Sequence, residues 1–224
     1  MLNRNCEVTL TNLDAEEQAL LDETFDQFRQ ASQHVADYGW SDNPANIIDS
    51  KSKLHDATYE DVREQTDLTA NHVQAARSLA AEAVDSCSEL YFEEDQSISK
   101  PTFHGSVVVY DARTVTFNDE HCTLSTTDGR VSAEYVLPED TTDTPFETYW
   151  NNPEWEKNSA TLHKRGGTYY LHVNFQKESK TDVSAVKNGP VLGVHCTVDG
   201  QLAAPSTGAF LGNPGYPHSK PNQD

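Results

Sequence analysis

Histidine and cysteine are the residue types in this chain best suited to metal binding or nucleophilic chemistry. The sequence holds 9 histidines and 4 cysteines. No two cysteines stand at C-x-x-C spacing, and no histidine pair is spaced from a cysteine as zinc ligands usually are, so we expect no zinc site. The thiols lie far apart in apolar contexts, which favours buried, neutral side chains in a reducing cytoplasm: Cys6, Cys87, Cys122 and Cys196.

Motifs of the common enzyme classes are missing from the sequence. It contains no G-x-S-x-G, G-x-G-x-x-G or P-loop pattern, so hydrolase, dinucleotide and NTPase functions have no motif to support them. Carboxylates are abundant, but no acid–base constellation stands out among them. A small metal-dependent nuclease built on these carboxylates is kept as the enzymatic alternative.

The acid excess is large: 16 Lys and Arg against 36 Asp and Glu give 16 − 36 = −20. In dilute salt such a charge repels nucleic acid. The acids are spread along the chain, and this pattern, with few lysines, resembles that of proteins from salt-loving archaea. In molar salt the screening length falls to about 3 Å, so a few local Arg and Lys contacts decide nucleic-acid binding. We interpret the acidity as a property of the habitat.

Helices are predicted in the first hundred residues, after a short strand over Cys6–Leu10. Asp14 and Glu17 form a capping-box pair that begins a helix, and Gly39 suits its C′ position. A weaker helix is predicted over Thr58–Gln65, and a third is capped by Thr66 or Asp67. The first helix has an apolar face made of Leu13, Leu20, Leu21, Phe25, Phe28, Ala31, Val35 and Tyr38, and the third has one made of Leu68, Val73, Ala76, Ala80, Val84, Cys87 and Tyr91.

Strands are predicted after Pro101, with Asp128-Gly129 and Arg165-Gly166-Gly167 as hairpin turns. Tyr169, Leu171, Val173 and Phe175 alternate, so they point to one face. A last strand ends before the turn Asp199-Gly200, and the residues beyond Gly212 are expected to be disordered. The expected strands are Phe103–Tyr110, Thr114–Phe117, Cys122–Thr126, Arg130–Leu137, Thr161–His163, Thr168–Phe175 and Val191–Thr197.

These elements predict an α+β protein in which a helical bundle is inserted between an N-terminal strand and a β-barrel-like domain. No stretch approaches the ~20 apolar residues of a membrane helix, and residues 1–10 lack the apolar core of a secretory signal. We therefore expect a cytoplasmic protein with no membrane partner.

Seven short motifs, taken in order, resemble the N-terminal half of haloarchaeal TnpB (OrfB) proteins, the transposon-encoded relatives of type V CRISPR effectors. Each motif alone is modest, whereas their order is specific, and the resemblance covers roughly residues 5–213. The motifs are Ala36–Trp40, Leu54–Tyr59, Thr69–Arg77, Lys100–Phe103, Val109–Asp111, Leu124–Thr126 and Tyr135–Pro138.

The resemblance implies a wedge-type β-barrel with a helical recognition insertion, followed by a RuvC-type, RNase H-like sheet. In the family this sheet cleaves DNA under RNA guidance with two Mg²⁺ ions on three carboxylates, and it carries a structural Zn²⁺ ribbon. The corresponding segments here are residues 1–12 (first barrel strand), 13–99 (helical insertion), 100–188 (barrel), 189–212 (start of the RuvC-like sheet) and 213–224 (disordered tail).

This sequence departs from the family where the nuclease begins. Val191–His195 aligns with the opening RuvC strand, and His195 occupies the position of the first expected Asp. An imidazole lacks the negative charge that draws Mg²⁺ from water, so we expect a lost catalytic position. The alternative is a replacement ligand paired with Asp199. The other acids and the zinc ribbon are also missing, so the resemblance predicts a truncated, inactive transposase that uses neither metal.

The resemblance also implies DNA and a guide RNA as partners, with an intact transposon protein acting in trans as a further possibility. Arg77, Lys100 and Arg113 are the candidates for phosphate contacts, although solvated or ion-paired side chains are the alternative. Tyr110 is a candidate for stacking on a base, as are Trp40, Trp150 and Trp155, with packing in the core as the alternative. A non-functional pseudogene product is the remaining alternative.

Overall fold

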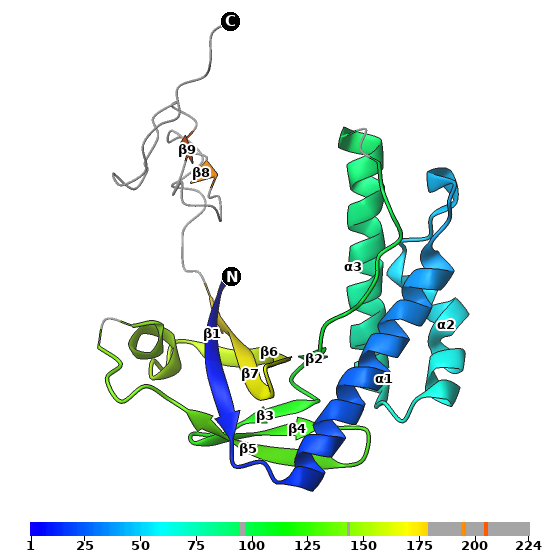
Figure 1. The fold of residues 1–224 in the computed structure, drawn as a ribbon. Helices are drawn as coiled ribbons and strands as arrows, with labels where there is room; N and C mark the ends of the chain where they lie inside the picture. The colour runs from blue at the N-terminus through cyan, green and yellow to red at the C-terminus, as the bar shows by residue number, and fades with distance from the viewer. Residues whose placement is uncertain (95–96, 143, 179–193, 196–203, 206–224) are drawn as a thin grey trace, which may run out of the picture. The chain divides into compact units, whose positions relative to one another are not determined.

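The computed structural model describes residues 1–94, 97–142, 144–178, 194–195 and 204–205. The chain divides into two units, Met1–Ser179 and Lys180–Asp224. Figure 1 shows the elements of the first unit, in which three helices stand beside a curled sheet. The elements in chain order are β1 (Leu2–Thr11), α1 (Ala15–Gly39), the 3-10 turn η1 (Pro44–Asn46), α2 (Lys51–Gln65), α3 (Ala70–Glu94), β2 (Val107–Tyr110), β3 (Val115–Phe117), β4 (His121–Ser125), β5 (Arg130–Val136), the π-helical turn η2 (Phe146–Trp150), β6 (Glu156–Arg165), β7 (Thr168–Lys177), β8 (Val194–His195) and β9 (Ala204–Pro205).

The sheet of the first unit has seven antiparallel strands in the order β2-β6-β7-β1-β5-β4-β3. The N-terminal strand β1 is central, since it pairs with β7 from Leu2 to Leu10 and with β5 near its end. The sheet curls into a half-barrel whose two edge strands, β2 and β3, follow each other in sequence (Figure 1). The predicted α+β class is therefore confirmed, while its assignment as a wedge barrel stays a prediction.

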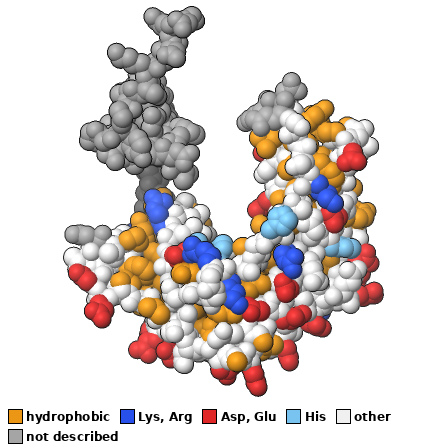
Figure 2. All heavy atoms as spheres, viewed as in Figure 1, with side chains coloured by type: hydrophobic (Ala, Val, Ile, Leu, Met, Phe, Trp, Pro, Cys, Tyr) orange, Lys and Arg blue, Asp and Glu red, His pale blue; other side chains and the backbone are white. Residues whose placement is uncertain are grey.

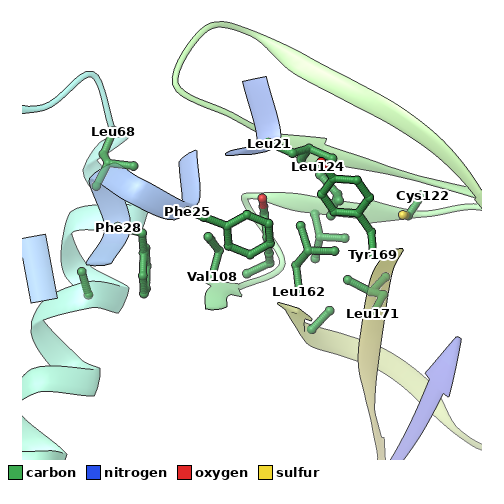
Figure 3. Packing of buried hydrophobic residues seen from close by; sticks show 14 of the residues in the cluster. Leu21, Phe25, Phe28, Leu68, Val108, Cys122, Leu124, Leu162, Tyr169 and Leu171 are labelled. Atoms are coloured by element: carbon green, nitrogen blue, oxygen red, sulfur yellow. The ribbon is translucent and has the colours of Figure 1, made fainter. Parts of the chain in front are cut away.

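The alternation predicted for β7 is confirmed, because its four inward side chains are all buried: Tyr169, Leu171, Val173 and Phe175. Helix α1 covers one end of this core, and the ring of Phe25 lies parallel to that of Tyr169 with centroids 6.3 Å apart (Figure 3). Burying side chains of this size contributes about 1.5–3 kcal/mol each, so this contact joins the helices to the sheet.

Helix α1 begins as predicted, because Asp14 accepts hydrogen bonds from the backbone of Glu16 and Glu17 and the Glu17 carboxylate accepts one from the backbone of Asp14. Its apolar stripe is largely buried, but Tyr38 is 51% exposed and does not belong to it. The predicted role of Gly39 is wrong: it is the last helical residue and has no left-handed φ. A Cβ there would lie 2.6 Å from the Ile48 carbonyl oxygen, so the glycine permits a close backbone approach.

The other two helices differ from their predicted bounds. Helix α2 starts at Lys51, seven residues before Thr58, and Leu54, in its first turn, is completely buried. Helix α3 starts at Ala70, and the hydroxyl of Thr69, rather than Thr66 or Asp67, accepts the backbone N–H of His72 at 3.3 Å. The buried stripe of α3 ends near Val84, since Tyr91 is 39% exposed.

The second half of the barrel is more extensive than predicted. Strand β6 runs over Glu156–Arg165 and not only over Thr161–His163, because β7 pairs with it along its whole length. The turn η2 was not predicted, and it places Trp150 beneath Phe175 with ring centroids 5.6 Å apart. In the second unit, β8 and β9 form an antiparallel pair. The rest of the predicted strand Val191–Thr197, the turn Asp199-Gly200 and the tail beyond Gly212 lie outside the described residues.

Candidate nucleic-acid interface

The outward face of strands β1, β7 and β6 gathers basic and aromatic side chains. Since inward residues alternate with outward ones, Tyr170 and His172 point away from the core on β7, and His163 and Arg165 do so on β6. The register sets His163 opposite Tyr170 and Glu7 of β1 opposite His172. We call these five side chains the sheet-face cluster. Lys, Arg and His side chains are visible on the hollowed face of the first unit in Figure 2, while many acids lie along its rim.

Arg165 is the central cation of the sheet-face cluster. Its guanidinium carbon lies 4.1 Å from the ring centroid of Tyr170, and its Nη2 forms an ion pair with Glu7. A guanidinium stacked on a ring keeps its in-plane donors free to turn outward, where a phosphate can take two of them. Arg165 and Glu7 are 56% and 43% exposed, and such a surface pair contributes little stability, so a phosphate can replace Glu7.

Two histidines and Glu7 lie in close contact in this cluster. The rings of His163 and His172 lie 4.4 Å apart at 37°, and His172 Nε2 is 2.6 Å from Glu7 Oε2. Burial lowers the pKa of His163, and the nearby His172 and Arg165 lower it further, although Glu7 partly opposes them. Burial alone would raise the pKa of Glu7, but hydrogen bonds from Arg165 and His172 outweigh that effect and lower it. Both shifts favour the neutral form of His163 and the ionised form of Glu7.

The β6–β7 hairpin that carries the cluster is fastened to α1. Lys164 Nζ donates to both carboxylate oxygens of Asp22 at 2.6 and 2.7 Å, and Tyr169 Oη donates to the same carboxylate at 2.9 Å. The hydrogen bond to Asp22 is the main cause of the raised pKa of Lys164. These contacts fix the hairpin against the helical part and leave the outward face accessible.

The phosphate contacts predicted from the sequence are not brought into this cluster. Lys100 forms an ion pair with Asp37 of α1 at 2.8 Å, and Arg113 binds Asp111 through Nε and Nη2 at 3.1 and 2.8 Å. Both therefore match the ion-paired alternative. Arg77 is half-buried on α3, where its Nη2 reaches Ser78 Oγ at 3.4 Å and its Nε is buried without a partner among the described residues.

The predicted stacking residues are placed mainly in packing roles. Tyr110 is completely buried between His72 and the barrel core, so its ring is not accessible to a base. Trp150 is 8% exposed and packs against Tyr135, while Trp155 packs against Tyr149 with centroids 4.8 Å apart. Trp40 is half-buried after the end of α1. His195 lies in β8, and its side chain is outside the described part of the chain.

The sequence contained a usable indication of the sheet-face cluster that the motif-based prediction missed. If Tyr169, Leu171 and Val173 point inward, then Tyr170 and His172 must point outward. The approach of Arg165 to Tyr170 and the pairing of His163 with His172 depend in addition on the hairpin register, which the sequence did not specify beyond the turn.

Metal chemistry finds no support in the described residues. Among them, no group of three or more His, Cys, Asp or Glu side chains could hold a metal ion. Most of residues 189–212, which the resemblance assigns to the nuclease sheet, lie outside the described residues, so the expectation that the chain uses neither metal stays a prediction. Burial raises the pKa of Cys6 to about 11 and that of Cys122 to about 12, as expected for neutral buried thiols, whereas Cys87 is only partly buried.

Comparison with known proteins gives no relative on which to base a function: no protein-family model matches the chain, and no curated protein matches it. Among the helices of the described residues, none is both long and apolar enough to span a membrane.

Proposed function

We propose that this chain is a nucleic-acid-binding protein of the TnpB/OrfB type that holds a guide RNA or a DNA duplex and does not cleave it. Three observations support the proposal: the ordered set of seven motifs, the helical bundle inserted after the first strand of a half-barrel, and the sheet-face cluster. The cluster is the observation that carries the binding function, because it combines a stacked guanidinium, a tyrosine ring and two imidazoles on one accessible surface.

Binding at this surface uses backbone and stacking contacts in place of base-edge recognition. Phosphate contacts fix a protein on a nucleic acid without reading its sequence, and aromatic faces accept any base. In molar salt the overall charge of −20 is screened beyond about 3 Å, so the local cations decide the affinity. Replacement of Glu7 by a phosphate leaves the Arg165–Tyr170 stack intact and frees a carboxylate to the solvent.

The absence of cleavage follows from His195, which stands where the resemblance places the first magnesium-binding Asp. A neutral or cationic imidazole cannot replace a carboxylate ligand of Mg²⁺. The nuclease alternative is retained as an outcome of the tests, since a divalent-metal-dependent cleavage of DNA or RNA by the purified chain would contradict this part of the proposal.

The binding function is tested with the full chain in molar KCl by fluorescence anisotropy of labelled RNA and DNA. We expect Arg165→Gln and Tyr170→Leu each to weaken binding by about tenfold, as charged hydrogen bonds and base–aromatic stacking are worth about 1–3 kcal/mol. Arg29→Gln, which removes an exposed ion pair with Asp26 on α1, is the matched control. Equal affinities for Arg165→Gln, Tyr170→Leu and the parent protein would exclude the sheet-face cluster as the interface.

A further inference from the structure

A second site lies at the other side of the half-barrel, where the edge strand β3 passes the start of β6. It is an open cleft of about 880 Å³. Aromatic and apolar side chains form part of its lining, and asparagines, one lysine and two acids supply the polar groups. The residues that the argument uses are Phe117, Trp150, Trp155, Lys157, Asn158, Asp119 and Glu156. This volume is in the range of sites that bind small organic molecules.

Lys157 is the unusual residue of the cleft. The register of β6 against β7 shifts between Lys157 and Ser159, so Lys157 pairs with the inward-facing Phe175. The bulge therefore turns a lysine toward the inner side of the sheet, where an apolar residue would otherwise be expected. Bulges of this kind commonly redirect a side chain at a functional site.

The ammonium group of Lys157 has no carboxylate partner within ion-pair distance among the described residues. It lies 4.3 Å from the ring centroid of Trp150, and the negative charge of Asp119 acts on it without forming an ion pair. Burial lowers its pKa. Many other Lys and Arg side chains in the described ranges are ion-paired, among them Lys51, Lys100 and Lys164. A half-buried ammonium without a direct ion pair is costly, and an anionic group in contact with it would compensate that cost.

The side chains that line the cleft indicate which kind of anionic ligand would fit it. Exposed parts of Trp155 and Phe117 offer flat apolar surface for a planar ring, and Asn158 offers an amide that can pair with the edge of a base. Lys157 can take one phosphate, whereas Asp119 and Glu156 would repel a second. Carboxylates in nucleotide sites accept hydrogen bonds from ribose hydroxyls, so the two acids fit a ribose better than more phosphate.

We propose that this cleft binds a single ribonucleotide carrying one phosphate, either free or as one unit of an RNA strand. The proposal goes beyond the sheet-face function and does not require it, because the cleft uses neither Arg165 nor Tyr170. If the ribonucleotide belongs to a strand, the cleft also gives the protein a means to distinguish RNA from DNA through the 2′-hydroxyl.

The test uses the full chain with Trp40→Phe, so that tryptophan fluorescence reports only Trp150 and Trp155. We expect adenosine 5′-monophosphate to quench this fluorescence saturably in the millimolar range or below. Lys157→Gln should weaken the binding by about tenfold, since it removes a charge-assisted hydrogen bond. Adenosine and 2′-deoxyadenosine 5′-monophosphate should each bind more weakly than the ribonucleotide.

Lys51→Gln is the matched control, because Lys51 is an exposed lysine paired with Glu82 away from the cleft. Lys157→Met keeps the aliphatic stem near Trp150 and serves if Lys157→Gln does not fold. No saturable quenching, or equal affinities for the parent and a folded Lys157 variant, would overturn the proposal. If a labelled RNA oligonucleotide binds more tightly than the mononucleotide, and Lys157→Gln weakens that binding, the ribonucleotide belongs to an RNA strand. If only the mononucleotide binds, the ligand is a free nucleotide.

The two proposals fail separately. Suppose that the mononucleotide binds in a way that depends on Lys157, but the parent protein retains no RNA. This result would contradict the proposed function and support ribonucleotide binding in the cleft. RNA binding that depends on Arg165 and is unchanged in Lys157→Gln, with no mononucleotide binding, would give the opposite result.

Discussion

His72 provides the sharpest test of the structure, because it is a titratable side chain buried completely where the helices meet the sheet. Its ring packs edge-on against Tyr110 of β2 and Phe28 of α1, with centroids 5.1 and 6.5 Å apart. Both ring nitrogens are buried and have no hydrogen-bond partner among the described residues. Burial lowers the pKa of His72 from 6.5 to about 4, and Asp111 offsets only part of this effect.

The sign of the pH dependence follows from this shift. Above pH 6.5 the imidazole is neutral in both states and contributes no pH dependence. Between pH 6.5 and about 4, the imidazole of His72 is protonated in the unfolded chain but stays neutral in the folded protein. The free energy of unfolding therefore falls as the pH falls. The pKa falls from 6.5 to about 4, and each pKa unit corresponds to about 1.36 kcal/mol. The free energy of unfolding should therefore fall by about 3 kcal/mol over this window.

The assay is urea unfolding in molar KCl at a series of pH values, followed by circular dichroism. Carboxylates with lowered pKa values also destabilise the protein in acid, so the informative quantity is the difference between the parent and His72→Leu. We expect the acid-induced loss to be about 3 kcal/mol smaller in His72→Leu. The control is His104→Gln at an exposed position. Parallel pH profiles for the parent and His72→Leu would refute the burial of an unpaired imidazole.

Three further predictions concern local features of the fold. Asp14→Ala removes the capping box of α1 and should lower the free energy of unfolding by about 1 kcal/mol in the same urea assay, whereas an unchanged midpoint would contradict the cap. Gly39→Ala should cost about 1–3 kcal/mol, since its Cβ would meet the Ile48 carbonyl oxygen; a thermal melt equal to that of the parent would show that this contact can relax. Cys122 should react with iodoacetamide more slowly than Cys87 in the native protein, because burial raises its thiol pKa to about 12; mass spectrometry of the labelled peptides measures this, and equal rates would contradict the packing.

The parts of the fold that were predictable are those that local chemistry specifies. Asp14 and Glu17 form a capping box within the first turn of α1. Their spacing of three residues in the sequence was therefore enough to predict where this helix starts. The inward side chains of β7 alternate strictly, and their burial followed from the period alone. These elements need no information from distant parts of the chain.

The parts that were not predictable depend on long-range pairing. The beginning of β6 is polar and does not alternate, and it becomes a strand because β7 pairs with it beyond the bulge at Lys157. The early start of α2 at Lys51 is supported by the packing of Leu54, which lies close to Gly39. Both contacts join residues that a local pattern cannot relate.

The candidate sites show the same division. The resemblance directed attention to Lys100, Arg113 and Tyr110, two of which are ion-paired and one buried. The side chains that can bind a ligand come from the β6–β7 hairpin. The strand register there places Arg165 on Tyr170, and a bulge redirects Lys157. Motif order did not point to these side chains, which only the register of the hairpin brings together.

The central position of β1 has a consequence for how the protein is made. Residues 2–11 leave the ribosome before the rest of the first unit, yet their principal partner is β7, over residues 168–177. The helices between them can form early from local contacts, whereas β1 must wait until nearly the whole first unit has been synthesised. This strand therefore lacks its main partner during most of the synthesis of the first unit. Its charged side chains, Arg4 and Glu7, disfavour pairing of the free strand with another chain during this time.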